Sequence, residues 1–219
     1  MTESSRTYLP AAGRDWLLPL YDPIVKLLGG EAARTVLIDQ AALRPGQRLL
    51  EIGCGTGALT TQIKRLHPDV EVVGLDPDSK ALARAGRKAA RAAVAIQFDP
   101  GFADELPYQE ASFDRVFSCF MFHHLPADEK EQTLREARRV LKAGGAFHML
   151  DFEGSEDRAH GLLAHLFHSN DRLKGNSESR VLSLMRQAGF ADPKKSAAGP
   201  CCLEASRTTG RGHRNETRL

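Results

Sequence analysis

The feature that most constrains the fold is an alternation, between residues 47 and 152, of short apolar runs with longer segments of helical period. Parallel strands need a crossover connection, and a helix is the usual one, so the alternation predicts a parallel sheet with helices on both faces. The expected strands are Arg48–Ile52, Glu71–Leu75, Val94–Phe98, Phe113–Phe120 and Ala146–Phe152. The expected helices between them are Gly57–Leu66, Ser79–Ala92 and Ala127–Leu141. The fold class is therefore α/β, with a doubly wound, mostly parallel sheet.

Helical periodicity also flanks this core. Before it, Leu17–Leu28 and Glu31–Ala42 indicate two helices, which would lie across the carboxyl ends of the strands or on the flank of the sheet. After it, Arg158–Phe167 and Glu178–Ala188 have helical period, whereas the last residues show no alternation of apolar and polar positions. We therefore divide the chain into an N-terminal helical lid over residues 1–45, an α/β core over 46–193 and a disordered basic tail over 194–219.

The composition limits the size and the partners of the protein. A chain of 219 residues that is 42% hydrophobic is long enough for one core and short for two. Its 30 Lys and Arg stand against 28 Asp and Glu, and the basic tail leaves the remaining body near neutral, so we expect no nucleic acid as partner. Neither a signal-like leader nor an apolar run of about 18 residues is visible, so we expect a cytoplasmic protein with no membrane span.

A glycine-rich turn follows the first expected strand. Gly53, Gly55 and Gly57 stand between the strand and a helix, where glycines let the main chain turn sharply and the first helical N–H groups face a ligand. The same stretch, read as Gly53-x-Gly55-x-x-Ala58 with Asp76 downstream, also fits a relaxed dinucleotide fingerprint. The turn by itself predicts a ligand site and leaves two cofactors open.

An acidic residue, Glu51, precedes these glycines, and residues 49–57 resemble the first motif of class I S-adenosylmethionine-dependent methyltransferases. Further motifs of that family are matched in chain order by Val73–Asp78, Leu106–Pro107, Ser112–Asp114, His123–Leu125 and Leu141–Gly145. The resemblance spans about residues 20–190 and is strongest to the methyltransferases of ubiquinone and menaquinone biosynthesis. It implies a Rossmann-like fold, S-adenosylmethionine as cofactor and methyl transfer to a small-molecule acceptor, with a carbon or oxygen of an aromatic or quinone-like ring as the first candidate.

The resemblance also assigns roles in the cofactor site. Glu51 matches the acidic residue that helps to hold the amino group of the ligand, or it is a buried, paired carboxylate with a structural task. Asp76 is placed to accept both ribose hydroxyls, or it caps the following helix, for which Ser79 is the expected N-cap. The expected cofactor-binding residues are Glu51, Gly53, Cys54, Gly55, Thr56, Gly57, Asp76, Pro77, Gly101, Phe102, Ala103 and Ser118.

One position departs from the family pattern. Where the family has an acidic residue four positions before the Leu-Pro pair, which accepts a hydrogen bond from the adenine amino group, this chain has Phe102. Either Phe102 stacks on the purine while a backbone N–H reads its edge, or Asp99 or Asp104 reaches in from a shifted loop. We favour the loop Gly101–Ala103 against adenine, with Asp104 as the second choice.

Few catalytic side chains are needed, because the methyl group on a sulfonium is already activated and the protein mainly positions the acceptor. His123 and His124 follow the fourth strand, and we favour His124 as a general base, with simple packing in the apolar run around them as the open alternative. Tyr21 resembles a residue of the quinone-type enzymes, in which an N-terminal helix closes over the donor. Asp151, at the end of the fifth strand, faces the same crevice and is a candidate for contact with the acceptor.

We expect no metal. His160, His165 and His168 share an expected helix, but their spacing matches no metal signature. The four cysteines lack both the paired spacing of a zinc site and the even spacing of a disulfide framework, so free thiols are expected.

The carboxyl end leaves structural and functional alternatives open. Members of the family normally end in a sixth strand and an antiparallel seventh inserted beside it, whereas Phe190–Ala198 is a poor strand. The seventh strand is either absent or formed by Cys201–Ala205, and its absence would expose a sheet edge that a homodimer could cover. A protein that binds S-adenosylmethionine without turnover is therefore an alternative to the enzyme, and a NAD-dependent oxidoreductase is a less favoured one.

Overall fold

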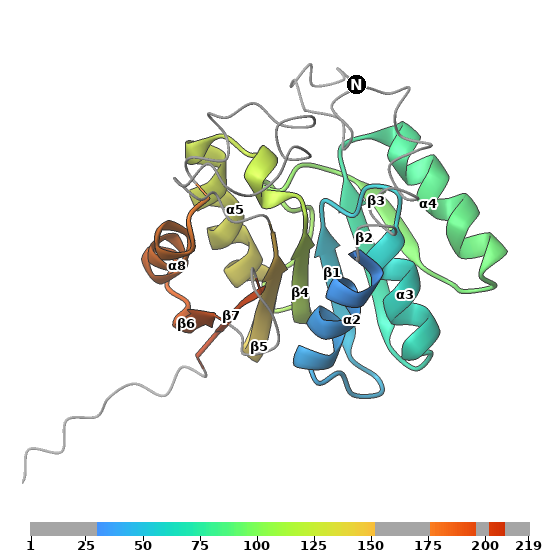
Figure 1. The fold of residues 1–219 in the computed structure, drawn as a ribbon, viewed down its shortest axis with the longest axis horizontal. Coiled ribbons are helices and arrows are strands. Elements are labelled where there is room, and N and C mark those ends of the chain that lie inside the picture. Colours follow the sequence, from blue (N-terminus) through green and yellow to red (C-terminus); the bar gives the residue numbers. More distant parts are fainter. Residues whose placement is uncertain (1–29, 152–175, 196–201, 209–219) are drawn as a thin grey trace, which may run out of the picture.

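The computed structural model describes residues 30–151, 176–195 and 202–208. They form a seven-stranded sheet in the order β3-β2-β1-β4-β5-β7-β6, in which β1 to β5 run parallel (Figure 1). The strands are β1 Arg48–Ile52, β2 Glu71–Asp76, β3 Gln97–Pro100, β4 Phe113–Cys119, β5 Leu141–Leu150, β6 Ala191–Lys195 and β7 Cys202–Ser206. The strand order reverses between β1 and β4, so the crevice at their carboxyl ends is the point where such sheets bind ligands.

Helices cover both faces of the sheet, as the alternation predicts (Figure 1). Leu49 of β1 packs with α2 and α3 on one face, while the next residue, Leu50, packs with α5 and α8 on the other, because successive side chains of a strand point to opposite faces. α4 lies beside α3 and packs on β2 and β3. The helices are α2 Gly30–Gln40, α3 Ala58–Leu66, α4 Ser79–Arg91, α5 Ala127–Val140 and α8 Glu178–Gln187. The doubly wound α/β architecture is confirmed.

Two strands begin at other residues than the sequence predicts. β3 begins later, because Val94 still belongs to the turn that ends α4: its N–H donates to the carbonyl of Ala89 at 3.1 Å. β5 begins earlier, because Leu141 is already extended and pairs with Phe113. Gly144 and Gly145, which follow the expected helix Ala127–Leu141, therefore lie inside the strand.

Of the two alternatives for the seventh strand, its absence is wrong and its formation near Cys201–Ala205 is confirmed. β7 lies between β5 and β6 and runs antiparallel to both, in the stretch that was the alternative location. Cys202 joins the core on the α2 face, whereas Leu203 and Ala205 join the core on the α5 face. The strand was hard to recognise because it is short and built largely from small residues, although its two-sided burial is typical of an interior strand. The open edge that favoured a homodimer is thereby filled.

The expected domain limits also change. α2 packs against the sheet through buried Leu37 and Ile38, so residues 30–40 belong to the core and not to a lid. At the other end, β6 and β7 extend the core beyond residue 193, into the segment expected to be a disordered tail. Tyr21, the helix predicted at Leu17–Leu28 and the helix predicted at Arg158–Phe167 lie outside the described residues. Within the described residues, no helix has the length and apolarity needed to cross a membrane.

Candidate functional site

The turn after β1 requires glycine. Gly53, Gly55 and Gly57 have φ values of +69°, +53° and +73°, in the left-handed region that other residues rarely adopt. The N–H groups of Gly53 and Cys54 both donate to the carbonyl of Leu75, at 2.8 and 3.0 Å, so the turn folds back on the end of β2. The backbone therefore has the shape that the glycine pattern predicts.

Two of these glycines also lack room for a side chain. A Cβ on Gly57 would lie 2.8 Å from the Cβ of Ala85, which brings α3 close to α4. A Cβ on Gly53 would lie 2.2 Å from the Cγ of Met121, in the segment after β4. The glycine turn and the segment after β4 are therefore in direct contact across the crevice between β1 and β4.

Asp76 ends β2 with its carboxylate held by two backbone N–H groups. Oδ2 accepts from Gly55 at 2.7 Å and Oδ1 accepts from Asp78 at 2.9 Å. Burial raises the pKa of Asp76 to about 6, against the lowering effect of these hydrogen bonds. Asp78 is the N-cap of α4, with Oδ1 accepting from two N–H groups of the first turn, so the cap expected at Ser79 and the alternative cap at Asp76 are both wrong.

Glu51 is buried beneath the turn. Its Oε2 accepts from the N–H of Thr60 at 3.0 Å, in the first turn of α3, whose N-cap Gly57 has no side chain to make that bond. A carboxylate is favourable at a helix N-terminus, yet burial raises the pKa of Glu51 to about 8. Glu51 thus makes the structural contact expected of a buried, paired carboxylate. Its contact with the amino group of a ligand stays an expectation.

The neighbouring residues of the expected cofactor set brace the turn. Burial raises the pKa of Cys54, whose Sγ would lie 2.9 Å from a Cβ on Gly74 of β2. Thr56 is buried, and its hydroxyl accepts from Nζ of Lys88 in α4 at 3.1 Å. Pro77 is half-buried between the two aspartates that end β2 and begin α4. These contacts hold the turn between β2 and α4.

The loop expected to face adenine begins beside Asp76. The N–H of Gly101 donates to the carbonyl of Asp76 at 3.3 Å, and Phe102 pairs with Glu105 in an isolated antiparallel bridge. Phe102 and Ala103 are half-buried. The loop therefore lies next to the carboxylate expected to hold the ribose, as an adenine contact from Gly101–Ala103 requires.

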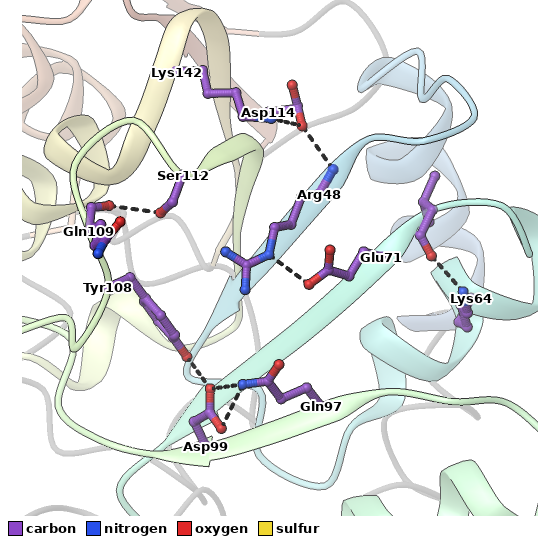
Figure 2. Close-up of polar contacts among 11 residues, drawn as sticks. Arg48, Lys64, Glu71, Gln97, Asp99, Tyr108, Gln109, Ser112, Asp114 and Lys142 are labelled. Atoms are coloured by element: carbon purple, nitrogen blue, oxygen red, sulfur yellow. Dashed lines mark hydrogen bonds and ion pairs between the residues drawn. The ribbon is translucent and has the colours of Figure 1, made fainter.

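Asp99 takes part in a different contact. The hydroxyl of Tyr108 donates to Asp99 Oδ2 at 2.9 Å, and Nε2 of Gln97 donates to the same carboxylate (Figure 2). Burial and this hydrogen bond raise the pKa of Tyr108 well above its usual range. Asp99 therefore anchors the loop to β3, which weakens the alternative in which it reads adenine.

Ser118 is a buried residue near the end of β4. Its register partners are Ile52 of β1 and Met149 of β5, so it stands in the middle of the sheet beside the crevice. Within the part of the chain that the structure describes, its Oγ has no hydrogen-bond partner. Because buried hydroxyls are rarely unpartnered, this atom is a candidate for contact with a ligand.

His123 forms a buried pair with Asp151. It lies in the short 3-10 helix η2 (Phe122–His124), and its Nδ1 is 2.5 Å from Asp151 Oδ1, while its backbone N–H donates to Oδ2 at 2.9 Å. A carboxylate in this position holds the imidazole in the tautomer with a proton on Nδ1, which leaves Nε2 as an acceptor. His124 is half-buried, with its ring centroid 4.1 Å from that of His123. The pairing of His123 was not foreseen, because it joins residues far apart in the sequence.

A buried lysine beside this pair was also missed. Lys130 of α5 is 3% exposed, and its Nζ donates to Oδ1 of Asn176 at 3.4 Å. A signal was present in the sequence: Lys130 has the helical spacing of Thr133, Leu134 and Ala137, which form the buried stripe of α5. A lysine in such a stripe indicates a buried charge with a partner.

These features together fit a nucleoside ligand with a polar tail. The glycines leave a concave backbone that side chains would fill, and each oxygen of Asp76 keeps acceptor capacity beyond its one backbone hydrogen bond. Ser118 adds a buried hydroxyl at the crevice. Among the residues that the structure describes, no group of three or more His, Cys, Asp and Glu side chains could hold a metal ion, and His160, His165 and His168 lie outside them.

Comparisons with known proteins agree with this geometry. Residues 49–145 match the family described as a methyltransferase domain. The chain is 39% identical over 128 residues to the 27-O-demethylrifamycin SV methyltransferase of Amycolatopsis mediterranei, covering 56% of this chain and 46% of that protein. It is 32% identical over 154 residues to the demethylmenaquinone methyltransferase of Thermus thermophilus, covering 69% of each chain. The chain thus spans about half the length of the first relative and about two thirds of the second.

Solved structures show the same fold. The apo form of the S-adenosylmethionine-dependent methyltransferase SibL is similar with a TM-score of 0.68 and 21% identity, over 94% of this chain and 64% of that one. The phosphoethanolamine N-methyltransferase 2 of Haemonchus contortus, solved with S-adenosylhomocysteine, has a TM-score of 0.63 and 20% identity, over 74% of this chain and 37% of that one.

Proposed function

The chain belongs to the class I S-adenosylmethionine-dependent methyltransferases, and we propose that it transfers a methyl group from this cofactor to an oxygen or carbon of an aromatic or quinone-like ring. Family membership decides against the nicotinamide alternative, which explained the glycine turn and left Glu51 and the later motifs without a role. The cofactor supplies a methyl group activated by its sulfonium. The chain's own residues have to hold it, orient the acceptor and take up the acceptor's proton.

The cofactor would lie along the carboxyl ends of β1, β2 and β3. Asp76 would accept the ribose hydroxyls with the lone pairs that its backbone hydrogen bonds leave free, and the loop Gly101–Ala103 would flank the adenine. The glycine turn would let the main chain approach the methionine portion closely, with Glu51 below it and Ser118 across the crevice. This placement uses the expected cofactor residues without moving a strand.

The observation that carries the proposed reaction is the His123–Asp151 pair. Met121, two residues before His123, touches the glycine turn, so in the proposed arrangement the pair would lie near the methyl group of the donor. In the proposed step the bound cofactor would supply its methyl group to the acceptor oxygen and leave as S-adenosylhomocysteine, and Nε2 of His123 would take the proton that this oxygen loses. His124, favoured from the sequence, lies close enough to share the role, so the two are to be tested separately.

The names of two relatives support the two kinds of acceptor in the proposal. One is named for a 27-O-demethyl compound, in which an oxygen carries the methyl group, and the other for demethylmenaquinone, which is a quinone. A hydroxyl on an aromatic or quinone-like ring fits a neutral histidine base, because such hydroxyls are far more acidic than alcohols. An active carbon of the same kind of ring becomes nucleophilic when the neighbouring hydroxyl loses its proton, so one base serves both outcomes.

The test is a product screen with the full chain. The protein is incubated with S-adenosylmethionine and a panel of catechols, naphthohydroquinones and simple alcohols, and products are identified by a mass increase of one CH2. We expect methylated rings and unmodified alcohols, with His123→Gln and Asp151→Asn slowing transfer at least about 100-fold. Methylation of alcohols alone, or full activity of His123→Gln with loss in His124→Gln, would refute this assignment of substrate or base.

Calorimetric titration with S-adenosylhomocysteine accompanies the screen. Unchanged affinity in His123→Gln shows that the variant has lost chemistry and kept the cofactor site. Tight binding by the wild type without any methylated product would favour the alternative of a protein that binds the cofactor without turnover.

We also infer a cytoplasmic location, which the free thiols of Cys54, Cys119 and Cys202 support.

A further inference from the structure

Two side chains of α5 hold the loop that connects β3 to β4. Nε and Nη2 of Arg139 donate to the two carboxylate oxygens of Glu136, each at 2.7 Å, so the Glu136–Arg139 pair is bidentate. The pair holds both backbone groups of Leu106: Glu136 Oε2 accepts from its N–H at 3.0 Å, and Arg139 Nη2 donates to its carbonyl at 2.9 Å. Arg139 Nη1 also donates to the carbonyl of Tyr108 at 2.7 Å. The loop is therefore fixed to α5 at two of its residues.

The residues just before this attachment are those expected to face adenine. A Cβ on Gly101 would lie 2.8 Å from Cδ1 of Leu75, and its N–H donates to the carbonyl of Asp76 at 3.3 Å, so the loop begins directly against β2. The turn that follows is closed by the N–H of Glu105, which donates to the carbonyl of Phe102 at 3.3 Å. Only this turn separates the contact with β2 from the contact with α5, so the α5 pair sets where the turn lies.

Tyr108 connects the same loop to the sheet. Its hydroxyl donates to Asp99 of β3 at 2.9 Å, while its carbonyl accepts from Arg139 (Figure 2). Its ring meets that of Phe113, at the start of β4, edge to face with centroids 5.1 Å apart. The hydroxyl, the ring and the carbonyl of one residue are thus all engaged. The loop is held by β2, β3, β4 and α5 together, which favours a site that is in place before a ligand binds.

We propose that Glu136 and Arg139 are positioning residues for the adenine end of the cofactor site: they fix the loop so that its backbone N–H groups, and not an acidic side chain, select adenine. The placement of adenine beside Gly101–Ala103 rests on the proposed function. A carboxylate side chain can adjust its rotamer to the base, whereas a backbone N–H cannot. Because Phe102 stands where the family has the acidic residue, recognition depends on how accurately the loop is held.

The pair lies outside the stripe through which α5 packs on the sheet. That stripe consists of the buried residues Lys130, Thr133, Leu134, Ala137 and Val140. The side chain of Arg139 is 34% exposed, so water could solvate its charge without the contacts to the loop. One turn earlier on the same helix, Arg135 forms an ion pair with Glu131 at a more exposed position. This second pair has the same chemistry and offers a matched control.

The test compares two ligands by isothermal calorimetry with the full chain: S-adenosylhomocysteine and S-inosylhomocysteine, in which an oxo group replaces the adenine amino group. N1 of adenine is an acceptor, whereas N1 of the inosyl base carries a proton, so a fixed backbone N–H distinguishes the two. We expect the wild type to prefer the adenosyl ligand at least about tenfold, and Arg139→Met to reduce that preference to about twofold or less. Arg135→Met should keep the preference of the wild type.

The ratio of the two affinities separates positioning from general destabilisation, which would weaken both ligands in parallel. An unchanged ratio in an Arg139→Met protein that is folded by circular dichroism would overturn the proposal, as would a wild type without preference. Loss of the preference in Asp104→Asn and not in Arg139→Met would also overturn it, because that side chain would then read the base.

Should Arg139→Met not fold, Arg139→Lys gives the same readout. It keeps the charge, but a single ammonium lacks the planar fork that reaches Glu136 and both carbonyls. None of these measurements needs an acceptor or a catalytic base. Failure of the product screen and failure of this inference are therefore distinguishable.

Discussion

The N–H of Gly55 donates to Oδ2 of Asp76 over 2.7 Å and so ties the turn after β1 to the end of β2. Because the other oxygen of Asp76 is held by the N–H of Asp78, the carboxylate cannot rotate without losing a hydrogen bond. The two halves of the proposed cofactor site, the glycine turn and the carboxylate of Asp76, are therefore held in place relative to each other by backbone hydrogen bonds. Such a site needs little reorganisation when a ligand binds.

Asp76→Ala is accordingly expected to weaken S-adenosylhomocysteine binding by at least about tenfold, since charged hydrogen bonds contribute about 1.5–3 kcal/mol each. Isothermal calorimetry measures the change, and Asp76→Asn should fall between Ala and the wild type because it keeps one acceptor oxygen. Asp69→Asn, an exposed aspartate at the other end of β2, is the control. Equal affinity in wild type and Asp76→Ala would place the ribose elsewhere.

Gly53→Ala is expected to destabilise the protein more than Gly46→Ala does. Both glycines have positive φ values, +69° and +79°, and an alanine there costs roughly 1–2 kcal/mol. The two positions differ in the room for a side chain, because a Cβ at Gly46 would have no atom within 4 Å whereas a Cβ at Gly53 would lie 2.2 Å from Met121. Chemical denaturation gives the free energy of unfolding of each variant. The loss in Gly46→Ala measures backbone strain, and the additional loss in Gly53→Ala measures the steric clash with Met121.

Met121→Ala tests whether the steric clash with Met121 causes the additional destabilisation. In that background the excess destabilisation of Gly53→Ala over Gly46→Ala should shrink, since the obstructing side chain is gone. Additive effects in the double variant would show that Met121 moves aside freely, and the close contact between the turn and the segment after β4 would then carry no energy.

The sequence predicts the backbone of the glycine turn because this part of the molecule is local. The turn from β1 into α3 is encoded by consecutive residues, so its strand, glycines and helix were all located correctly. The contacts that were missed join distant segments: His123 with Asp151, and Lys130 with Asn176. No local pattern specifies such pairs, because they depend on which strands become neighbours in the sheet.

Glu51→Gln is expected to change how the stability of the ligand-free protein depends on pH. The folded-state pKa of Glu51 is about 8, above its ordinary value of 4.5, so between these values the folded protein holds a proton that the unfolded chain has released. The free energy of unfolding of the wild-type protein therefore falls as pH rises, by up to about 1.4 kcal/mol per pH unit. Between pH 6 and 8, the difference between the wild type and Glu51→Gln isolates the contribution of Glu51, because the other groups that titrate there are the same in both proteins.

Denaturation of wild type and Glu51→Gln across that range should give curves that diverge with rising pH, with the variant the more stable at pH 8. The glutamine keeps an oxygen that can accept from Thr60, so the start of α3 stays capped. Glu71→Gln, whose carboxylate is exposed and paired with Arg48, is the control and should run parallel to the wild type (Figure 2). Parallel curves for Glu51→Gln as well would mean that Glu51 is ionised in the folded protein.

His148 has the opposite dependence on pH. It is buried in β5, stacked on Phe117 with ring centroids 5.4 Å apart, and its Nδ1 lies 3.4 Å from Nε2 of Gln40 in α2. Burial, with a smaller contribution from Arg115, lowers its pKa from 6.5 to about 4. As pH falls from 6.5 toward 4, His148 is protonated in the unfolded chain and stays neutral in the folded protein. The free energy of unfolding therefore decreases.

His148→Phe should remove this acid sensitivity, because phenylalanine preserves the stack on Phe117 and does not titrate. The slope of unfolding free energy against pH between 4 and 6.5 is the measured quantity, and the variant is expected to be flatter by up to about 1.4 kcal/mol per unit. His67→Phe, at the half-buried end of α3, replaces a histidine of different environment and serves as the control. If His148→Phe and wild type lose stability in parallel on acidification, the imidazole takes up its proton inside the folded core, and the contact with Gln40 must open to admit it.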